Sequence, residues 1–222
     1  MARIVIIGGH GKVALLAARL LVEAGHEVTS VIRKPSQADD LVALAARPFV
    51  LDIETASLAD LTEALTGHDV VVWSAGAGGG SPERTYAVDR DAAIRTVDAA
   101  LAAKVRRYVM VSYFGAGPDH GVPEDNGFFA YAEAKTAADQ HLAESGLDYV
   151  ILRPSGLTDD AASGSLEWGE GVKASTVSRG NVAGVIAAVI DAGSTSSESS
   201  NSAGRVLEFN DGARPISELV AG

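Results

Sequence analysis

Residues 3–21 read RIVIIGGHGKVALLAARLL, and this stretch decides the fold of the chain. It begins as a short β-branched run, is interrupted by three glycines within residues 8–11, and continues with apolar residues at helical spacing. The apolar positions of its second half follow the i, i+3, i+4, i+7, i+8 pattern of one helix face, and they are Val13, Leu16, Ala17, Leu20 and Leu21. Gly25 stands where a C-terminal helix cap is expected. The stretch therefore predicts a strand, a glycine turn and an amphipathic helix.

Runs similar to the first strand recur along the chain. They are short, β-branched and almost continuously apolar, and they cover residues 27–33, 48–52, 69–74, 107–112 and 149–153. This composition is typical of parallel strands that are buried on both faces. Helical patterns lie between them, near residues 36–46, 57–66, 83–103, 128–145 and 180–191. The alternation predicts an α/β fold with a doubly wound parallel sheet and helices on both of its faces.

The length and the later part of the sequence indicate one domain over residues 1–222. After residue 153 the regular alternation weakens, and residues 155–178 are expected to form a loop on the substrate side. Residues 192–204, AGSTSSESSNSAG, form a serine-rich tract that we expect to be a mobile surface loop. A late strand within residues 204–212 and a terminal helical turn within 216–222 follow.

The composition excludes several classes of function. The chain has no cysteine, which excludes disulfides, thiol catalysis and zinc–thiolate sites. Its five histidines are scattered, so no metal site is expected. A net charge of −11 disfavours binding to nucleic acid or to an anionic membrane, and no apolar run reaches the roughly 18 residues of a membrane-spanning helix. We expect a cytoplasmic protein that binds a small-molecule substrate.

The glycine turn has the composition of a dinucleotide-binding turn. Gly8 permits a tight turn, Gly11 lets a pyrophosphate approach the backbone, and Ala14 allows close packing of the helix on the strand. The N-terminus of the following helix offers free N–H groups to an anion. The predicted cofactor contacts here are Gly8, Gly9, His10, Gly11, Lys12 and Val13. The alternative is a turn that needs glycine for its backbone angles alone.

The ends of the next strands predict the type of cofactor. The second strand ends in Arg33 and Lys34, with no acidic residue before Asp39. A basic residue at this place accommodates a 2′-phosphate, so NADP(H) is preferred and NAD is possible. Two basic residues that merely end a strand in solvent are the alternative. At the end of the third strand, Asp52 and Ile53 are placed to bracket an adenine.

A second group of residues predicts proton transfer. Tyr131 and Lys135 are spaced i, i+4 on an expected helix and project from one face, while Ser112 ends the fifth strand. A tyrosine can exchange a proton with a substrate oxygen if a neighbouring ammonium lowers the pKa of its hydroxyl, and a serine can hold that oxygen. A packing tyrosine followed one turn later by an ordinary surface lysine is the alternative.

Together these stretches resemble the short-chain dehydrogenase/reductase superfamily, in particular its small atypical members related to the extended, epimerase-like type. The matching segments cover nearly the whole chain, and they include GGHGKVA, VVWSAGAGGG, YAVDRDAAIRTVDAA, MVSYFGA, YAEAK and YVILRPSGLTDD. The resemblance implies a Rossmann fold with Ser112, Tyr131 and Lys135 as the catalytic set, and Lys135 bonded to the nicotinamide ribose. It also implies cofactor contacts from Ser74, Ala75 and Gly76 after the fourth strand, and from Arg153 and Pro154 after the sixth.

One catalytic position departs from the family pattern. Where the family commonly has an asparagine of a proton relay, this chain has Asp89, which helical spacing turns inward and which Lys135 is expected to neutralise. We also expect a monomer, because the helices through which extended members pair carry charged residues on their predicted outer faces: Arg84, Arg90, Arg95, Glu133, Asp139 and Glu144.

These features predict an NADP(H)-dependent oxidoreductase or epimerase-type enzyme that acts on a small carbonyl or alcohol. Two alternatives remain open at this point. One is a non-catalytic NADP(H)-binding regulatory protein, and the other is a flavin- or tetrapyrrole-reductase-like enzyme that does not need Tyr131.

Overall fold

The computed structural model describes residues 1–79, 81–195 and 204–221, and within them a mixed sheet forms the centre of the fold. Its strands run in the order β11-β8-β10-β6-β5-β4-β1-β2-β3. The parallel part consists of β1 (Arg3–Ile7), β2 (Glu27–Ile32), β3 (Arg47–Val50), β4 (Val70–Trp73), β5 (Arg107–Val111), β6 (Asp148–Pro154) and β10 (Arg205–Asp211). Two short strands, β8 (Ser165–Glu167) and β11 (Arg214–Pro215), continue it antiparallel. A separate ribbon pairs β7 (Gly156–Thr158) with β9 (Thr176–Ser178).

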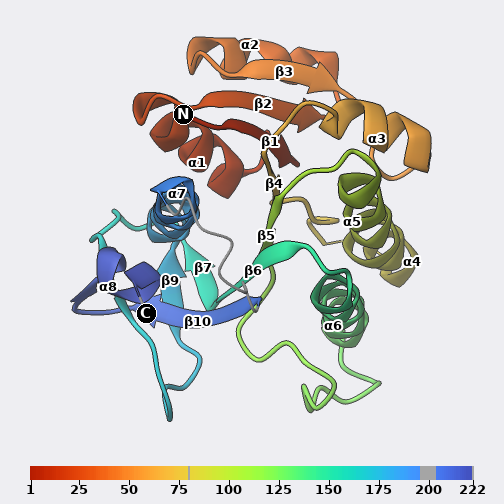
Figure 1. Cartoon of the computed structure of the whole chain (residues 1–222). Helices are drawn as coiled ribbons and strands as arrows, with labels where there is room; N and C mark the ends of the chain where they lie inside the picture. The colour runs from red at the N-terminus through yellow and green to blue at the C-terminus, as the bar shows by residue number, and fades with distance from the viewer. Residues whose placement is uncertain (80, 196–203, 222) are drawn as a thin grey trace.

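Helices cover both faces of this sheet, as Figure 1 shows. On one side lie α3 (Leu58–Leu65), α5 (Ala93–Ala102) and α6 (Phe129–Glu144), and on the other lie α1 (Lys12–Glu23), α7 (Arg179–Thr195) and α8 (Ile216–Ala221). The remaining helical segments are η1 (Pro35–Gln37), α2 (Ala38–Ala43), α4 (Pro82–Thr85) and η2 (Tyr86–Ala92). The predicted doubly wound α/β fold is confirmed. None of the helices in the described residues is long and apolar enough to cross a membrane.

The first strand shows why these runs are apolar at every position. Ile4 and Ile6 belong to the core cluster on the α1 and α7 side, while Val5 and Ile7 belong to the cluster on the α3 and α5 side. All four side chains are fully buried. Successive side chains of a strand point to opposite faces, so a strand covered on both faces must be apolar throughout.

The strand order reverses between β1 and β4. From β1 the chain moves outward to β2 and β3, then crosses back to β4 and continues through β5 and β6. Ile7 and Trp73, the last residues of β1 and β4, are paired in register. In such sheets ligands bind outside the carboxyl ends of the strands at this reversal. The segments that follow Ile7 and Trp73 therefore form the edge where a ligand site is expected.

Three predicted segments differ from the observed ones. The single helix expected over residues 83–103 is three segments, because the π-helix η2 separates α4 from α5. Residues 155–178 contain β7, β8 and β9 and are more regular than the predicted loop. In the serine-rich tract, α7 continues to Thr195, and residues 196–203 lie outside the described residues.

Candidate functional site

The first two glycines of the turn are required by backbone packing. Gly8 has φ +78°, and a Cβ there would lie 2.6 Å from the Cα of Ala75. A Cβ at Gly9 would lie 2.4 Å from the Cβ of Ser30. Any side chain at either position would push the glycine turn away from its neighbours on β2 and after β4. Gly9 is buried and does not line the clefts described below.

Gly11 is different, because its backbone angles suit any residue. It has φ −66° and ψ 151°, is exposed, and makes no side-chain cap for α1. The first N–H groups of α1 are thus left without an intrahelical or side-chain partner, which suits an anion. Gly11 lines two adjoining clefts, and these clefts also share residues 74–77 after β4. The glycine is needed here for open space rather than for conformation.

The first cleft, of about 290 Å³, lies over the ends of β1, β2 and β3. It brings together most of the predicted cofactor residues: Gly8, His10, Gly11, Arg33, Asp52, Ile53, Ser74, Ala75 and Gly76. Lys34 does not line this cleft, whereas Gln37, which the sequence did not single out, does. Arg33 is exposed and has no carboxylate partner among the described residues. The ring of His10 pairs with Asp40 at 2.7 Å.

Two arginines hold the wall of this first cleft. Arg84 donates to the carbonyl of Ala77 at 2.6 Å and pairs with Glu54 at 3.3 Å. Arg95 donates to the carbonyls of Ile53 and Glu54 at 3.2 and 3.1 Å. The prediction that Arg84 and Arg95 form a solvated outer helix face is wrong, because both bind the loop after β3.

The second cleft, of about 590 Å³, continues from Gly11 toward α6. It brings together the predicted catalytic residues Ser112, Tyr131 and Asp89 with the predicted cofactor residues Lys12 and Val13. The structure adds several residues that sequence reasoning did not assign to a site: Thr85, Gly127, Phe128, Leu157 and Arg179. The two clefts adjoin at Gly11 and residues 74–77, along the carboxyl edge of the sheet.

Asp139 is buried beneath the second cleft and is 3 % exposed, so its prediction as a solvated residue is wrong. Ser112 Oγ donates to Asp139 Oδ2 at 2.8 Å, and Arg153 Nε donates to the same atom at 3.2 Å. Burial raises the pKa of Asp139, and Lys135, the Ser112 hydroxyl and Arg153 oppose this shift. Asp139 follows Lys135 by four residues, so the i, i+4 spacing that singled out Tyr131 and Lys135 could also have found it.

Lys135 does not reach the cleft as predicted. It is 1 % exposed, and its Nζ donates to the carbonyl of Val111 at 2.7 Å. Burial lowers the pKa of Lys135, while the carboxylates of Asp139 and Asp89 oppose this shift. The lysine thus lies below the cleft floor and ties α6 to the end of β5. Its bond to a nicotinamide ribose stays a prediction.

Tyr131 has the predicted position but not the predicted acidity. Burial raises the pKa of its hydroxyl, and the carboxylates of Asp89 and Asp139 add to the shift. The prediction that a neighbouring ammonium lowers this pKa is therefore wrong. The hydroxyl has no hydrogen-bond partner among the described residues, and the ring contacts Tyr113 and Phe128. Tyr131 thus presents a neutral phenol to the cleft.

Asp89 points inward, as predicted, and is 1 % exposed. It lies in the π-helix η2, and its Oδ2 accepts from the Ala77 N–H at 3.0 Å. Its Oδ1 has no hydrogen-bond partner and would lie 3.1 Å from a Cβ at Gly76. Burial raises the pKa of Asp89, opposed first by Lys135 at longer range. The expected direct pairing of Asp89 with Lys135 is not found, and the carboxyl instead fixes the segment after β4.

Two further predicted cofactor residues lie away from the clefts. Arg153 pairs with Asp139 and with Glu208, at 3.2 and 3.3 Å. Pro154 is buried and pairs in register with Phe209 of β10. This segment of β6 therefore supports the buried charges from below.

An exposed ion-pair bridge spans the rim of the second cleft. Asp159 pairs with Lys12 at 2.7 Å and with Arg179 at 2.8 Å. It connects the glycine turn to the segment after β7 and to the start of α7. The sequence could have indicated Arg179, because it is a basic residue just before the helix expected near residues 180–191.

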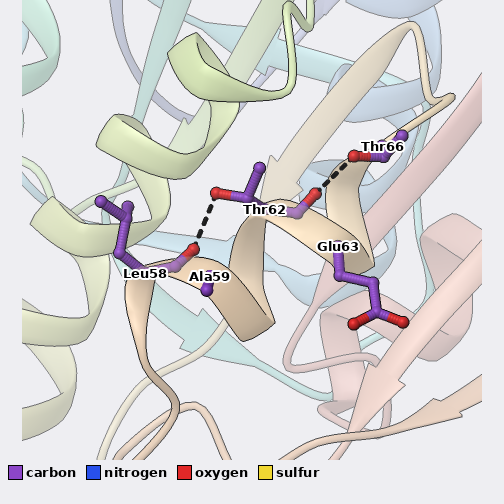
Figure 2. A pocket seen from close by; sticks show the side chains of 5 residues that line it. All are labelled: Leu58, Ala59, Thr62, Glu63 and Thr66. Carbon is purple, nitrogen blue, oxygen red and sulfur yellow. Dashed lines mark hydrogen bonds between the residues drawn. The ribbon is translucent and has the colours of Figure 1, made fainter.

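A separate hollow, of about 800 Å³, lies on α3 (Figure 2). Its lining comes from this helix and its C-cap: Leu58, Ala59, Thr62, Glu63 and Thr66. The two threonine hydroxyls donate to carbonyls of their own helix at 2.7 Å. An open surface with its hydroxyls already bonded offers little to a ligand, so we do not assign a function to it. In the part of the chain that the structure describes, no cluster of metal-ligating side chains is found.

Comparison with known proteins indicates a nucleotide-binding family. A model of the NAD(P)H-binding family matches residues 8–192. The chain belongs to the NAD(P)H-binding family. The matched residues of this NAD(P)H-binding chain contain both clefts and end within α7.

The chain is similar to several relatives over nearly the whole length of both proteins. A UPF0659 protein of Schizosaccharomyces pombe is 36 % identical and aligns over 100 % of this chain and 95 % of its own. The uncharacterized sugar epimerase YhfK of Bacillus subtilis is 28 % identical over 98 % of each chain. Among solved structures, a putative NAD-dependent epimerase/dehydratase from Bacillus halodurans is similar, with a TM-score of 0.87 and 28 % sequence identity. The match covers 100 % of this chain and 99 % of the other. The family is oxidoreductase- and epimerase-like, and its ligand is a nicotinamide dinucleotide.

Proposed function

We propose that the protein is an NADPH-dependent reductase of carbonyl compounds. The observation that carries the proposal is the neutral, unpartnered hydroxyl of Tyr131, which opens into the second cleft beside Ser112. A phenol whose pKa is raised is protonated at neutral pH, so it is present as a proton donor and rarely as a base. It gives its proton to a strongly basic acceptor, such as the oxyanion that develops on a carbonyl oxygen during reduction. Reduction needs such a donor at the substrate oxygen.

The residues of the two clefts support a division of labour. The bare backbone at Gly11 and the N-terminus of α1 would hold the pyrophosphate, and Arg33 would hold a 2′-phosphate. When bound, the dihydronicotinamide supplies a hydride to the substrate carbon. Tyr131 then donates its proton to the substrate oxygen. Ser112 is held by Asp139, so it offers its lone pairs rather than its proton to the cleft.

The same observation favours a reductase over an epimerase. An epimerase of this kind must first take a proton from a hydroxyl, so Tyr131 would have to be ionised already in the resting enzyme. In reduction Tyr131 starts neutral, and a tyrosinate forms only as the proton passes to the substrate oxygen. The carboxylates of Asp89 and Asp139 oppose a tyrosinate. The relative named as a sugar epimerase therefore does not decide the reaction of this chain.

The experiment is an NADPH-oxidation screen against carbonyl compounds, quinones and flavins, made with the unaltered protein and with Tyr131→Phe. Tyr86→Phe is the matched control, because Tyr86 lies in η2 below Arg90 and outside both clefts. We expect turnover of a carbonyl substrate, lost in Tyr131→Phe and kept in Tyr86→Phe. Turnover retained by Tyr131→Phe would support a flavin- or tetrapyrrole-reductase-like enzyme instead. NADPH binding with no turnover of any compound would support a regulatory protein.

A further inference from the structure

Two rings of an aromatic cluster, those of Phe128 and Tyr131, line the second cleft, and Tyr113 packs against both. The rings of Tyr113, Phe128 and Tyr131 contact one another with centroid separations of 5.1–5.6 Å. Tyr113 follows β5, Phe128 caps α6, and Tyr131 lies one turn into that helix. Aromatic contacts at this separation hold the rings in place. The two rings that line the cleft therefore present fixed, flat, apolar surfaces beside the Tyr131 hydroxyl.

An exposed leucine contributes to the same cleft from a distant part of the sequence. Leu157 lies on β7 and is 39 % exposed, and Phe128 is 43 % exposed. Both line the second cleft together with Tyr131. Other exposed large hydrophobic residues, such as Val206 and Leu101, line neither cleft. Apolar side chains left open to solvent in a concave site indicate that an apolar ligand covers them.

The polar groups of this cleft are few, and most are already bonded. Ser112 donates to Asp139, Asp89 accepts from Ala77, and Lys12 and Arg179 pair with Asp159. Among the described residues, the side-chain donors of the cleft without a partner are the hydroxyls of Tyr131, Thr85 and Ser74, and Ser74 lies at the end shared with the first cleft. A sugar would bury several hydroxyls here without replacing their bonds to water, at a cost of about 1–3 kcal/mol for each unbonded group. The lining therefore suits a substrate with a single acceptor oxygen near Tyr131.

We propose that the substrate is a flat, mostly apolar aromatic carbonyl compound, such as a naphthoquinone, held between Phe128 and Leu157. This inference rests on the proposed reductase function and names its substrate class. One hydride, which carries two electrons, passes from NADPH to the quinone, and one proton passes from Tyr131 to a quinone oxygen. The products are the hydroquinone and NADP⁺, and Tyr131 regains its proton from solvent.

The test measures steady-state NADPH oxidation with menadione, a methylated naphthoquinone, and with glyceraldehyde, a small polar aldehyde. The variants are Phe128→Ala and Leu157→Ala, and the matched control is Val206→Ala, an exposed apolar residue outside the clefts. We expect menadione to be the better substrate by kcat/KM. Loss of apolar contact in a pocket changes discrimination by about 10–200-fold, so each cleft variant should raise the KM for menadione at least about tenfold. The NADPH dissociation constant should stay unchanged in all three variants.

Leu157→Ala guards against an indirect effect, because Phe128 also packs on Tyr131 and its loss could move that hydroxyl. Leu157 has no place in the aromatic cluster. If glyceraldehyde is reduced as well as menadione, and neither cleft variant changes the KM for menadione, the substrate class is wrong and the reductase function stands. If NADPH binds but is oxidised by neither compound nor by the wider screen, the reductase function itself is wrong.

Discussion

The two clefts differ in where their charged groups lie. Around the first cleft the charges are at the surface: Arg33 is exposed, and Arg84 binds carbonyl and carboxylate groups of the rim. The second cleft has an exposed ion-pair bridge on its rim, but beneath it Lys135, Asp139 and Asp89 are buried, each no more than 3 % exposed. A surface charge can contact a ligand at little cost, whereas a buried charge must be balanced by its neighbours. We therefore expect cofactor recognition to depend on the backbone shape of the turn, and the chemistry to depend on a balance of buried charges.

The largest expected effect tests the backbone of the first cleft. In Gly11→Val the new side chain would stand over the N-terminus of α1, where a pyrophosphate is expected, and would also approach the Gly8 carbonyl. We expect NADPH affinity to fall at least about 100-fold, or ~2.7 kcal/mol, while far-ultraviolet circular dichroism stays native. Gly8→Ala is the contrasting variant, because its strain and its clash with Ala75 should lower stability as well as binding. Normal NADPH affinity in Gly11→Val, measured by calorimetric titration, would leave the glycine turn with a structural role only.

The next prediction tests the buried charges of the second cleft. Asp139→Ala removes the acceptor of Ser112 and one partner of Arg153, and leaves Lys135 less compensated. Breaking a buried ion pair costs about 3–5 kcal/mol, so urea unfolding should show a loss of stability of this size. Asp98→Ala, which breaks a partly exposed pair with His141, should cost at most about 1 kcal/mol. Equal costs for the two variants would mean that burial of Asp139 has no special consequence.

Arg33→Ala sharpens the comparison from the cofactor side. A hydrogen bond to a charged group is worth about 1.5–3 kcal/mol, so loss of Arg33 should weaken NADPH binding roughly 10–100-fold and leave NADH binding unchanged. Lys34→Ala is the control, because this neighbour is exposed but does not line the cleft. Calorimetric titration of NADPH and NADH against the unaltered protein, Arg33→Ala and Lys34→Ala measures the six dissociation constants. If the unaltered protein binds NADPH and NADH equally, the predicted preference is wrong.

The smallest expected effect concerns the pH dependence of stability. The pKa of Asp89 is raised in the folded protein, so ionisation of its carboxyl lowers the stability of the fold. When the carboxyl is protonated, this loss of stability disappears. As pH rises from the unfolded pKa of 3.8 through the folded value, the unaltered protein should lose stability relative to Asp89→Asn. A tenfold difference between the folded and unfolded acid dissociation constants corresponds to about 1.4 kcal/mol. Urea unfolding of both proteins between acid and neutral pH measures the difference, and a gap that stays constant with pH would show that Asp89 is not desolvated.

The residues that sequence can predict are those whose role depends on near neighbours. The glycine turn, Arg33 and Asp52 each follow closely on the end of a strand, and Gly8, Gly11, Arg33 and Asp52 line the first cleft. Sequence assigns Asp139 and Arg84 to solvent because both are charged and are expected on the outer faces of helices, while their partners come from distant strands and loops. Spacing finds Tyr131, but the acidity of its hydroxyl depends on Asp89 and Asp139, and no spacing rule gives that. Long-range partners therefore decide which predictions about the site are wrong.

The π-helix η2 makes the length of one segment as important as its composition. A π-helix bonds i to i+5, so residues 86–92 act as a one-residue insertion fixed within a helix. If the same number of residues took up ordinary α-helical bonding, α4 would turn by roughly 100° relative to α5. Arg84 would then leave Ala77 and Glu54, while Arg95 would keep its bonds to the loop after β3. The extra residue that η2 accommodates therefore decides where Arg84 points, whatever side chains the segment carries.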